Sequence, residues 1–192
     1  MDLDRFFDAE FDEHERVARG TRALKPAFVK LVDVCARALN AGNKIMLFGN
    51  GGSAADAQHL ATELVVRYKV NRAPLAAIAL TTDSSMLTAG ANDFCYDTVF
   101  ARQLAALGKA GDVAIGITTS GESENVIAAL KTARGIGITA AALSGKGGGR
   151  LNGLAEPLLI VPSSTTARIQ EMHITLGQML CDALEQQCAR AT

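Results

Sequence analysis

The sequence has no excess of either charge and no long apolar stretch, and both absences narrow what it can do. Its 19 Lys and Arg and its 20 Asp and Glu leave a formal net charge of −1. Without a dense Lys/Arg cluster, binding to nucleic-acid phosphates is not expected. No apolar run approaches the ~20 residues of a membrane helix. The acidic start, MDLDR, does not resemble a signal peptide. We therefore expect a cytoplasmic protein that does not contact the membrane.

Cysteine is scarce as well. The four cysteines show no paired spacing of the kind that holds a metal. Cys181 and Cys188 lie two turns apart on one predicted helix, roughly 10 Å, which is too far for a disulfide. We therefore expect all four, Cys35 and Cys95 included, to be buried thiols in a reducing compartment.

The order of elements predicts an α/β fold. Two helical segments come first, and strand–helix units then alternate to the end. The strands are short and mostly apolar, as in parallel sheets covered by helices on both faces. No linker or low-complexity tract splits the chain, so we expect one domain over 1–192, with helices over 1–40 and a three-layer sandwich over 44–192 around a five-stranded parallel, flavodoxin-like sheet. The predicted helices are 3–18, 26–39, 54–69, 84–91, 97–107, 123–134 and 165–189, and the predicted strands are 44–48, 75–80, 113–118, 139–143 and 158–161.

The first helix carries an apolar stripe of Phe6, Phe7 and Phe11. This spacing places the three rings on one helix face. We expect the stripe to pack on its own domain. The alternative is that an amphipathic helix ahead of the sandwich serves as an arm that packs on another subunit.

The loop after the first predicted strand has the composition of an anion-binding turn. Residues 48–53 read FGNGGS and lead from a strand into a helix. Glycines let the backbone approach an anion closely, and a helix N-terminus offers unpaired N–H groups and a partial positive charge. Ser53 is expected at the helix N-cap, with its hydroxyl free to bind a ligand. Asn50, Gly51, Gly52 and Ser53 are therefore predicted to cradle a phosphate.

A second polar loop follows the strand 113–118 and contributes the hydroxyl side chains of Thr118, Thr119, Ser120 and Ser123. Ligands of such sheets bind beyond the carboxyl ends of the strands, near the switch in strand order, so the two loops are expected to share one pocket. Neither loop has the Gly-Lys-Ser/Thr ending or the G-x-G-x-x-G spacing of nucleotide sites. The sequence therefore predicts a small phosphorylated ligand rather than a nucleotide.

His59 and Glu63 lie one helical turn apart on the helix that follows the glycine loop, so they share a face. A carboxylate near an apolar wall, with its pKa raised toward neutrality, can remove a proton from carbon. The alternative is an exposed ion pair of little consequence. Because the pair follows a loop of the phosphate-binding type, we favour the chemical interpretation.

Four segments together resemble the sugar isomerase (SIS) domain family: residues 49–59 (GNGGSAADAQH), 91–93 (AND), 118–121 (TTSG) and 168–173 (RIQEMH). The resemblance covers nearly the whole chain. It is strongest to the aldose–ketose isomerases that convert sedoheptulose 7-phosphate to D-glycero-D-manno-heptose 7-phosphate, through an enediol, for bacterial surface polysaccharide. It implies a sugar-phosphate substrate and a homotetramer whose active sites form between subunits.

The resemblance also implies roles for single residues. It implies that Glu63 is the base and that a histidine on the last helix is its partner. It implies zinc in some members, held at the positions of His59, Glu63, Gln170 and that histidine. The positions implied to bind the substrate are Ser53, Thr118, Ser120 and Ser123 on the phosphate, with Asp93 and Gln170 near the sugar.

The chain departs from the family pattern at the partner position, where Gln178 replaces histidine. Glutamine cannot carry a proton at neutral pH and is a poor metal ligand. His173, one turn after Gln170, is a candidate substitute acid. Two alternatives to this isomerase stay open: a non-catalytic regulator that resembles the DnaA initiator-associating protein, and a different sugar-phosphate isomerase of the same domain family.

Overall fold

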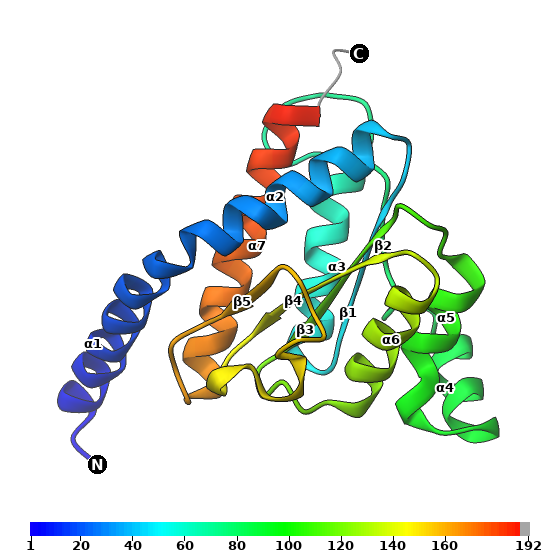
Figure 1. The fold of residues 1–192 in the computed structure, drawn as a ribbon. Helices are drawn as coiled ribbons and strands as arrows, with labels where there is room; N and C mark the ends of the chain where they lie inside the picture. The colour runs from blue at the N-terminus through cyan, green and yellow to red at the C-terminus, as the bar shows by residue number, and fades with distance from the viewer. Residues whose placement is uncertain (189–192) are drawn as a thin grey trace.

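Five short apolar segments pair as one parallel sheet at the centre of the protein (Figure 1). The structure, a computed structural model, describes residues 1–188. The strand order is β2-β1-β3-β4-β5, and every neighbouring pair is parallel. The predicted five-stranded parallel sheet is therefore confirmed. The strands are β1 (Ile45–Gly49), β2 (Ala77–Ala79), β3 (Val113–Thr118), β4 (Thr139–Ser144) and β5 (Leu158–Ile160).

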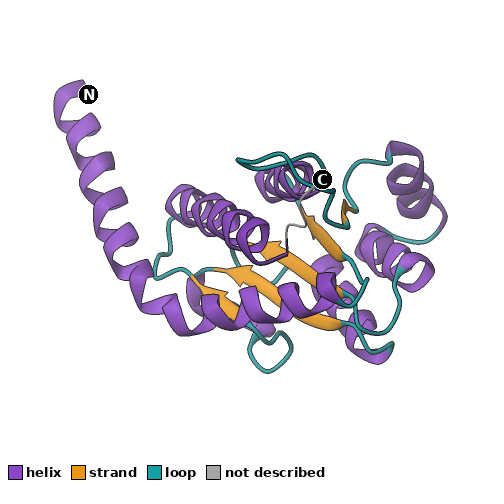
Figure 2. Cartoon of the chain, turned by 90° about the horizontal axis from the view of Figure 1, so that it is seen from above, coloured by secondary structure: helices purple, strands orange, loops and turns teal. Residues whose placement is uncertain are grey.

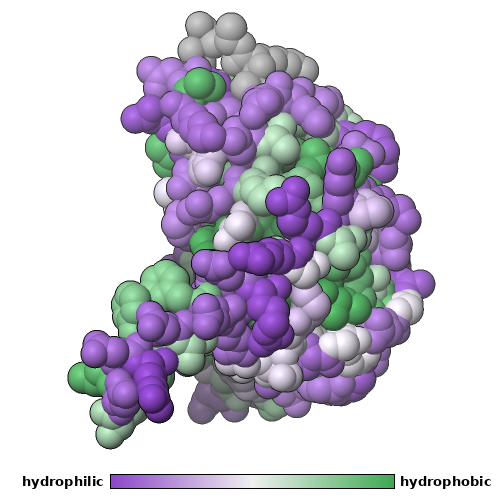
Figure 3. All heavy atoms as spheres, turned by 90° about the vertical axis from the view of Figure 1, so that its left-hand side faces the viewer, coloured by the Kyte–Doolittle hydropathy of each residue, from purple (hydrophilic) through white to green (hydrophobic). Residues whose placement is uncertain are grey.

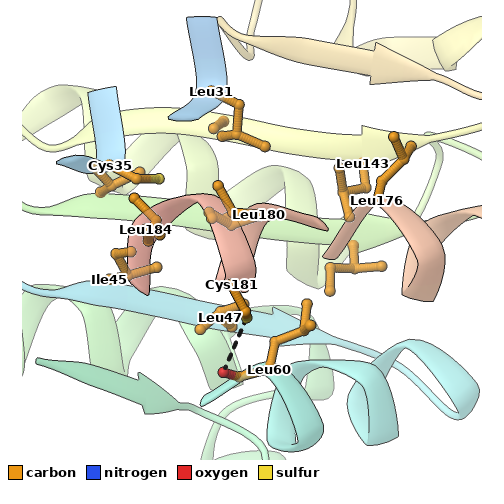
Figure 4. Packing of buried hydrophobic residues seen from close by; sticks show 14 of the residues in the cluster. Leu31, Cys35, Ile45, Leu47, Leu60, Leu143, Leu176, Leu180, Cys181 and Leu184 are labelled. Atoms are coloured by element: carbon orange, nitrogen blue, oxygen red, sulfur yellow. Dashed lines mark hydrogen bonds between the residues drawn. The ribbon is translucent and has the colours of Figure 1, made fainter. Parts of the chain in front are cut away.

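Helices cover both faces of the sheet, as the apolar strands predict. On one face, Ile45 and Leu47 of β1 join a core with α2, α3 and α7. On the other face, Met46 and Phe48 join a core with α5 and α6. Figure 4 shows the first core, in which Leu180, Cys181 and Leu184 of α7 lie between the side chains of α2 and those of Ile45 and Leu47 in β1. The helices are α1 (Leu3–Thr21), α2 (Lys25–Asn40), α3 (Gly52–Val65), α4 (Ser84–Asp93), α5 (Val99–Leu107), α6 (Glu124–Gly135) and α7 (Thr166–Cys188).

Element ends differ from the prediction by a few residues. The edge strand β2 is shorter than predicted because Leu75 donates its N–H to the carbonyl of Leu64, at the end of α3, and not to the sheet. α3 begins two residues earlier than predicted and ends four residues earlier, at Val65. The predicted end of the last helix, at 189, lies outside the described residues.

The helix α1 corrects one prediction. Phe6, Phe7 and Phe11 do not pack on their own domain: they are 50%, 61% and 56% exposed. Figures 1 and 2 show α1 projecting away from the sandwich, and Figure 3 shows apolar side chains on the projecting part. From Glu10 onward α1 contacts the body: Arg168 of α7 donates to the Glu10 carbonyl, and Val17 joins the core. The three rings nevertheless stay largely exposed.

The cysteines correct another prediction. All four are free thiols, but Cys95 is exposed while the other three are buried. Cys95 lies in the segment between α4 and α5, outside both cores. No helix among residues 1–188 is long and apolar enough to cross a membrane.

Candidate active site

The glycine loop forms a tight turn at the carboxyl end of β1. Gly51 has φ +55°, a left-handed value that favours glycine, and it caps α3. The prediction that Ser53 is the N-cap was wrong. Because the turn at Gly51 starts the helix at Gly52, Ser53 falls in the first helical turn and is 3% exposed. A Cβ atom on Gly49 would lie 2.7 Å from the Ser53 Cβ and 2.6 Å from the Ile117 carbonyl oxygen, so only glycine fits there.

The second loop gathers hydroxyl groups at the end of β3, as predicted. The Thr118 Oγ1 lies 2.9 Å from the Ser123 Oγ and 3.4 Å from the Ser120 Oγ. Ser120 also accepts the N–H of Glu122. Ser123 holds the N-cap position of α6, yet its hydroxyl makes no capping bond. The α6 N-terminus and this hydroxyl are therefore available to an anion. Thr119 is half-buried in the same turn.

The two loops lie next to each other because β1 and β3 are neighbours and Gly49 pairs with Ile117. The next two strands in the sequence, β2 and β3, lie on opposite sides of β1. The strand order therefore switches at β1 and β3, where the two loops lie. Asn50 and Asn125 join the loops through two amide hydrogen bonds of 2.9 and 2.8 Å. The Tyr96 hydroxyl donates to Asn50 as well. Neither Asn125 nor Tyr96 is among the residues predicted from the sequence, although Asn125 follows directly on the second loop.

The two loops, residues 50–53 and 118–123, are called the phosphate cradle below. The last helix adds Gln170 to it. A Cβ atom on Gly52 would lie 2.5 Å from the Gln170 Nε2, so the Gln170 amide covers the first turn of α3. Further along, Gly177 packs against Leu60, and the Cys181 thiol lies 3.8 Å from the Leu60 carbonyl (Figure 4). α3 and α7 therefore run side by side in the same direction. Gln178 is half-buried and directly follows Gly177 on α7.

His59 and Glu63 form the predicted pair on α3. The His59 Nε2 lies 3.1 Å from the Glu63 Oε1. The Glu63 side chain is the more covered of the two, at 22% exposed against 46% for His59. Arg72 donates to the Glu63 carbonyl oxygen and so fixes the end of the helix. The carboxylate is thereby held at a defined place beside the α3–α7 seam.

The zinc ligands implied by the family are only partly assembled. His59 and Glu63 are close enough to share one ion. The Gln170 amide rests on Gly52, which lies seven residues, about 10 Å along the helix, from His59. Among residues 1–188, no three His, Cys, Asp or Glu side chains gather in a way that could hold a metal.

Two candidates lie away from the cradle. Asp93 is exposed at the end of α4, accepts from the Asn92 side chain, and lines a separate hollow with Phe94 and Arg102. His173 is fully buried, and its Nε2 donates to the Ser144 carbonyl oxygen, 3.1 Å away. Burial lowers the pKa of His173 to about 4, so the imidazole is neutral at pH 7 and faces the core. His173 therefore does not substitute as the acid.

Burial of His173 predicts how stability depends on pH. Its pKa is near 6.5 in the unfolded chain and about 4 in the folded one, so the unfolded state binds the proton first. Stability is therefore full above pH 6.5 and declines toward pH 4 by about 1.4 kcal/mol per pH unit for this group. Urea unfolding at pH 7 and pH 5 measures the slope. His173→Gln keeps a donor for Ser144 but does not titrate, so its slope should be shallower; equal slopes would contradict the prediction.

Comparison with known proteins identifies a family profile, curated relatives and solved structures that are similar to this chain. The sequence profile of the SIS domain matches residues 11–145. The chain is 58% identical to the phosphoheptose isomerase of Paramagnetospirillum magneticum over 192 residues, the whole of both chains. A phosphoheptose isomerase structure from Neisseria gonorrhoeae has a TM-score of 0.91 at 42% identity, with 96% of this chain and 99% of that one covered. One from Francisella tularensis has a TM-score of 0.93 at 36% identity, covering 97% and 99%.

Proposed function

The chain belongs to the phosphoheptose isomerase family of SIS domain proteins, and we propose that it converts sedoheptulose 7-phosphate to D-glycero-D-manno-heptose 7-phosphate for bacterial surface polysaccharide. The observation that carries the proposal is the joint placement of two helix N-termini and four hydroxyl groups at one edge of the sheet, with Glu63 further along α3. The relatives carry the name of an isomerase, so the regulatory alternative is not favoured.

The cradle suits the phosphate group of the substrate. Ser53, Thr118, Ser120 and Ser123 bind its oxygens through their hydroxyl groups, together with backbone N–H groups of Gly51, Gly52 and Thr119. The starts of α3 and α6 add partial positive charge without a lysine. Asn50 holds the two loops at a fixed separation through Asn125. A rigid cradle of this kind binds one end of a sugar phosphate and leaves the other end to the catalytic groups.

The length of α3 suits a seven-carbon substrate. From Gly52, His59 and Glu63 lie seven and eleven residues along the helix, about 10 and 16 Å. With C–C bonds of about 1.5 Å, an open heptulose chain places its reacting carbons on the order of 10 Å from the phosphorus. The reacting carbons, C1 and C2, are at the end opposite the 7-phosphate. A substrate held in the cradle and extended along α3 therefore brings them to the His59–Glu63 pair.

Glu63 then works as the base of the isomerisation. Its carboxylate removes a proton from C1 of the ketose, the enediol forms, and the proton is returned to C2. Gln170 holds a sugar hydroxyl, and the role of Asp93 at the sugar stays a prediction, because Asp93 lines a separate hollow with Phe94 and Arg102. Gln178 can donate a hydrogen bond to a sugar oxygen but cannot transfer a proton, so in this chain solvent or a neighbouring group completes the proton transfers at the oxygens.

Zinc binding is part of the proposal. His59 and Glu63 fit as two of its ligands, whereas Gln170, which rests on Gly52, would have to move along α3 to join them. When bound, such an ion polarises the substrate oxygens and stabilises the enediol charge. Because amide groups bind zinc poorly, a glutamine at position 178 makes the site weak, and we expect zinc to be retained only at high concentration.

Turnover of sedoheptulose 7-phosphate, with and without added zinc, tests the proposed function. We expect slow turnover in the chain as it stands. Gln178→His should raise kcat by about 10²-fold, the low end of what one general acid or base contributes, and should tighten zinc binding. Gln186→His, on the exposed side of the same helix, is the control and should change neither. If both the original chain and Gln178→His are inactive with correct folding, the isomerase proposal fails and the regulator becomes the leading function.

We also propose that the protein is a homotetramer with active sites between subunits, and that α1 is the arm that assembles it. The stripe of Phe6, Phe7 and Phe11 is too apolar to remain in water, and the rings of Phe7 and Phe11 lie 4.8 Å apart as one surface. At its base α1 is fixed to α7, where His14 contacts Glu171 at 2.8 Å. The four free thiols suit the reducing cytoplasm that we propose as its compartment.

Removing the apolar stripe should dissociate the assembly. We expect a double variant, Phe7→Ser with Phe11→Ser, to shift the molar mass to smaller species in light scattering coupled to size exclusion, because each exposed ring buries apolar area only in the oligomer. Asp8→Ser with Asp12→Ser has the same spacing on exposed positions and should leave the mass unchanged. An unchanged mass in the phenylalanine variant would show that α1 does not assemble the protein.

A further inference from the structure

The turn after β4 has a backbone that only glycine supports over most of its length. Lys146, Gly147, Gly148 and Gly149 have consecutive positive φ angles of 49°, 79°, 86° and 50°. An ordinary side chain at a left-handed position costs roughly 1–2 kcal/mol. Four consecutive residues with positive φ therefore require a glycine-rich sequence such as this one. A flexible loop would have no need of so defined a conformation.

This turn packs directly on the loop of the predicted phosphate cradle. A Cβ atom on Gly121 would lie 2.2 Å from the Gly148 carbonyl oxygen. A Cβ atom on Gly149 would lie 2.9 Å from the carbonyl oxygen of Ser120. The N–H of Arg150 donates to the carbonyl of Gly121, 3.1 Å away. The two backbones therefore touch with no space for a side chain between them.

Contacts with residues outside the cradle loop also hold the turn in place. The Asn152 Nδ2 donates to the carbonyl oxygens of both Gly147 and Gly149, at 2.9 and 3.0 Å. The N–H of Lys146 donates to the Ser163 carbonyl, 3.1 Å away. Arg150 forms an ion pair with Glu124 in the first turn of α6. The turn is thus tied to its own chain and to the helix that starts at the cradle.

We propose that the turn 146–152 positions the second cradle loop, with Gly148 and Asn152 as its positioning residues for binding the substrate phosphate. The inference rests on the proposed function, in which Ser120 and Ser123 hold that phosphate. The carbonyl groups of Ser120 and Gly121 are in contact with the turn, so their peptide planes, and with them the Ser120 hydroxyl and the nearby N–H groups, keep the orientation that an anion needs. Neither Gly148 nor Asn152 touches the substrate.

Kinetics of three variants separate positioning from general stability. Asn152→Ala removes two hydrogen bonds at an exposed side chain, and Gly148→Ala forces a Cβ into the turn. We expect each to raise KM for sedoheptulose 7-phosphate about tenfold, as the loss of one to two hydrogen bonds gives, with kcat changed by less than about twofold. Gly153→Ala is the control: it has φ +75° and no atom within 4 Å, so it carries the same backbone strain without the contact.

A binding measurement keeps the inference testable if turnover is absent. The dissociation constant of inorganic phosphate, measured by calorimetry, should rise in Asn152→Ala and Gly148→Ala in parallel with KM and stay unchanged in Gly153→Ala. If Gly148→Ala does not fold, Asn152→Ala decides alone. Unchanged phosphate affinity in a folded Asn152→Ala overturns the inference, as does a fall in kcat with constant KM. A wild-type chain that binds phosphate but does not isomerise the heptulose overturns the proposed function and not the positioning.

Discussion

Glu63→Gln should abolish isomerisation: we expect kcat to fall by about 10²- to 10⁴-fold, the contribution of a positioned general base. Glutamine keeps the size and the contact of the side chain with His59, 3.1 Å away in the original chain, but it cannot accept a proton from carbon. KM should change little, because the phosphate cradle lies at the other end of α3. Steady-state kinetics with sedoheptulose 7-phosphate measures both constants.

Glu156→Gln is the matched control for Glu63→Gln. This glutamate is exposed, and its carboxylate pairs with the exposed Lys30 of α2. Its removal should leave both kcat and KM unchanged. A second readout is exchange of the substrate C1 proton with solvent deuterium, which Glu63→Gln should lose in proportion to kcat. If turnover persists within tenfold while exchange continues, another group is the base, and the placement of Glu63 at the α3–α7 seam has a structural purpose.

The parallel sheet was predictable because its strands are buried on both faces. In β1 and β3, alternate side chains point to opposite faces of the sheet, and each face is covered by helices. The strand sequences are therefore apolar throughout and differ clearly from the helix sequences. The two loops of the cradle followed from the same logic, since parallel strands end at one edge. The local sequence was therefore sufficient to predict the architecture and the location of the anion site.

The features that the sequence did not predict depend on contacts between residues far apart in the chain. The end of α3 was predicted four residues too late because the N–H groups of Tyr68, Lys69 and Val70 bond to Glu185, more than a hundred residues away, and leave the helix. The Asn50–Asn125 pair spans 75 residues. Neither is visible from spacing. Whether Phe7 is covered depends on a surface that a single chain does not contain.

The periodicity of α7 places His173 among core residues. Its position one turn after Gln170 alone suggests a candidate acid. On α7, however, it follows Ile169 and Met172 and precedes Leu176, all of them buried. This stripe belongs to the core face of the helix, whereas Gln170 contacts Gly52 of α3. One turn of sequence separation thus did not mean one shared face.

The other large effect is expected from a buried ion pair that holds the end of α3. Arg72 and Glu185 have side chains only 1% and 3% exposed, and their Nε–Oε2 distance is 3.1 Å. Glu185 also accepts the three N–H groups of residues 68–70. Burial alone would raise the pKa of Glu185, but these N–H groups and the Arg72 charge outweigh it and lower the pKa below its usual range. Arg72 donates in turn to the carbonyl groups of Glu63 and Leu64.

Arg72→Met should therefore lower the free energy of unfolding by about 3–5 kcal/mol, because it leaves the Glu185 carboxylate buried without its counter-charge. Asp182→Asn breaks a solvent-exposed pair with Lys69 one turn earlier on α7 and should cost far less, because water screens such pairs. Urea unfolding at pH 7 compares the two. Since the folded chain favours ionised Glu185, its contribution is present above the unfolded pKa and is lost as pH falls through the lower folded pKa. Glu185→Gln should thus be far less stable than wild type at pH 7 and approach it in acid; a constant difference would mean that packing, not charge, fixes this end of α3.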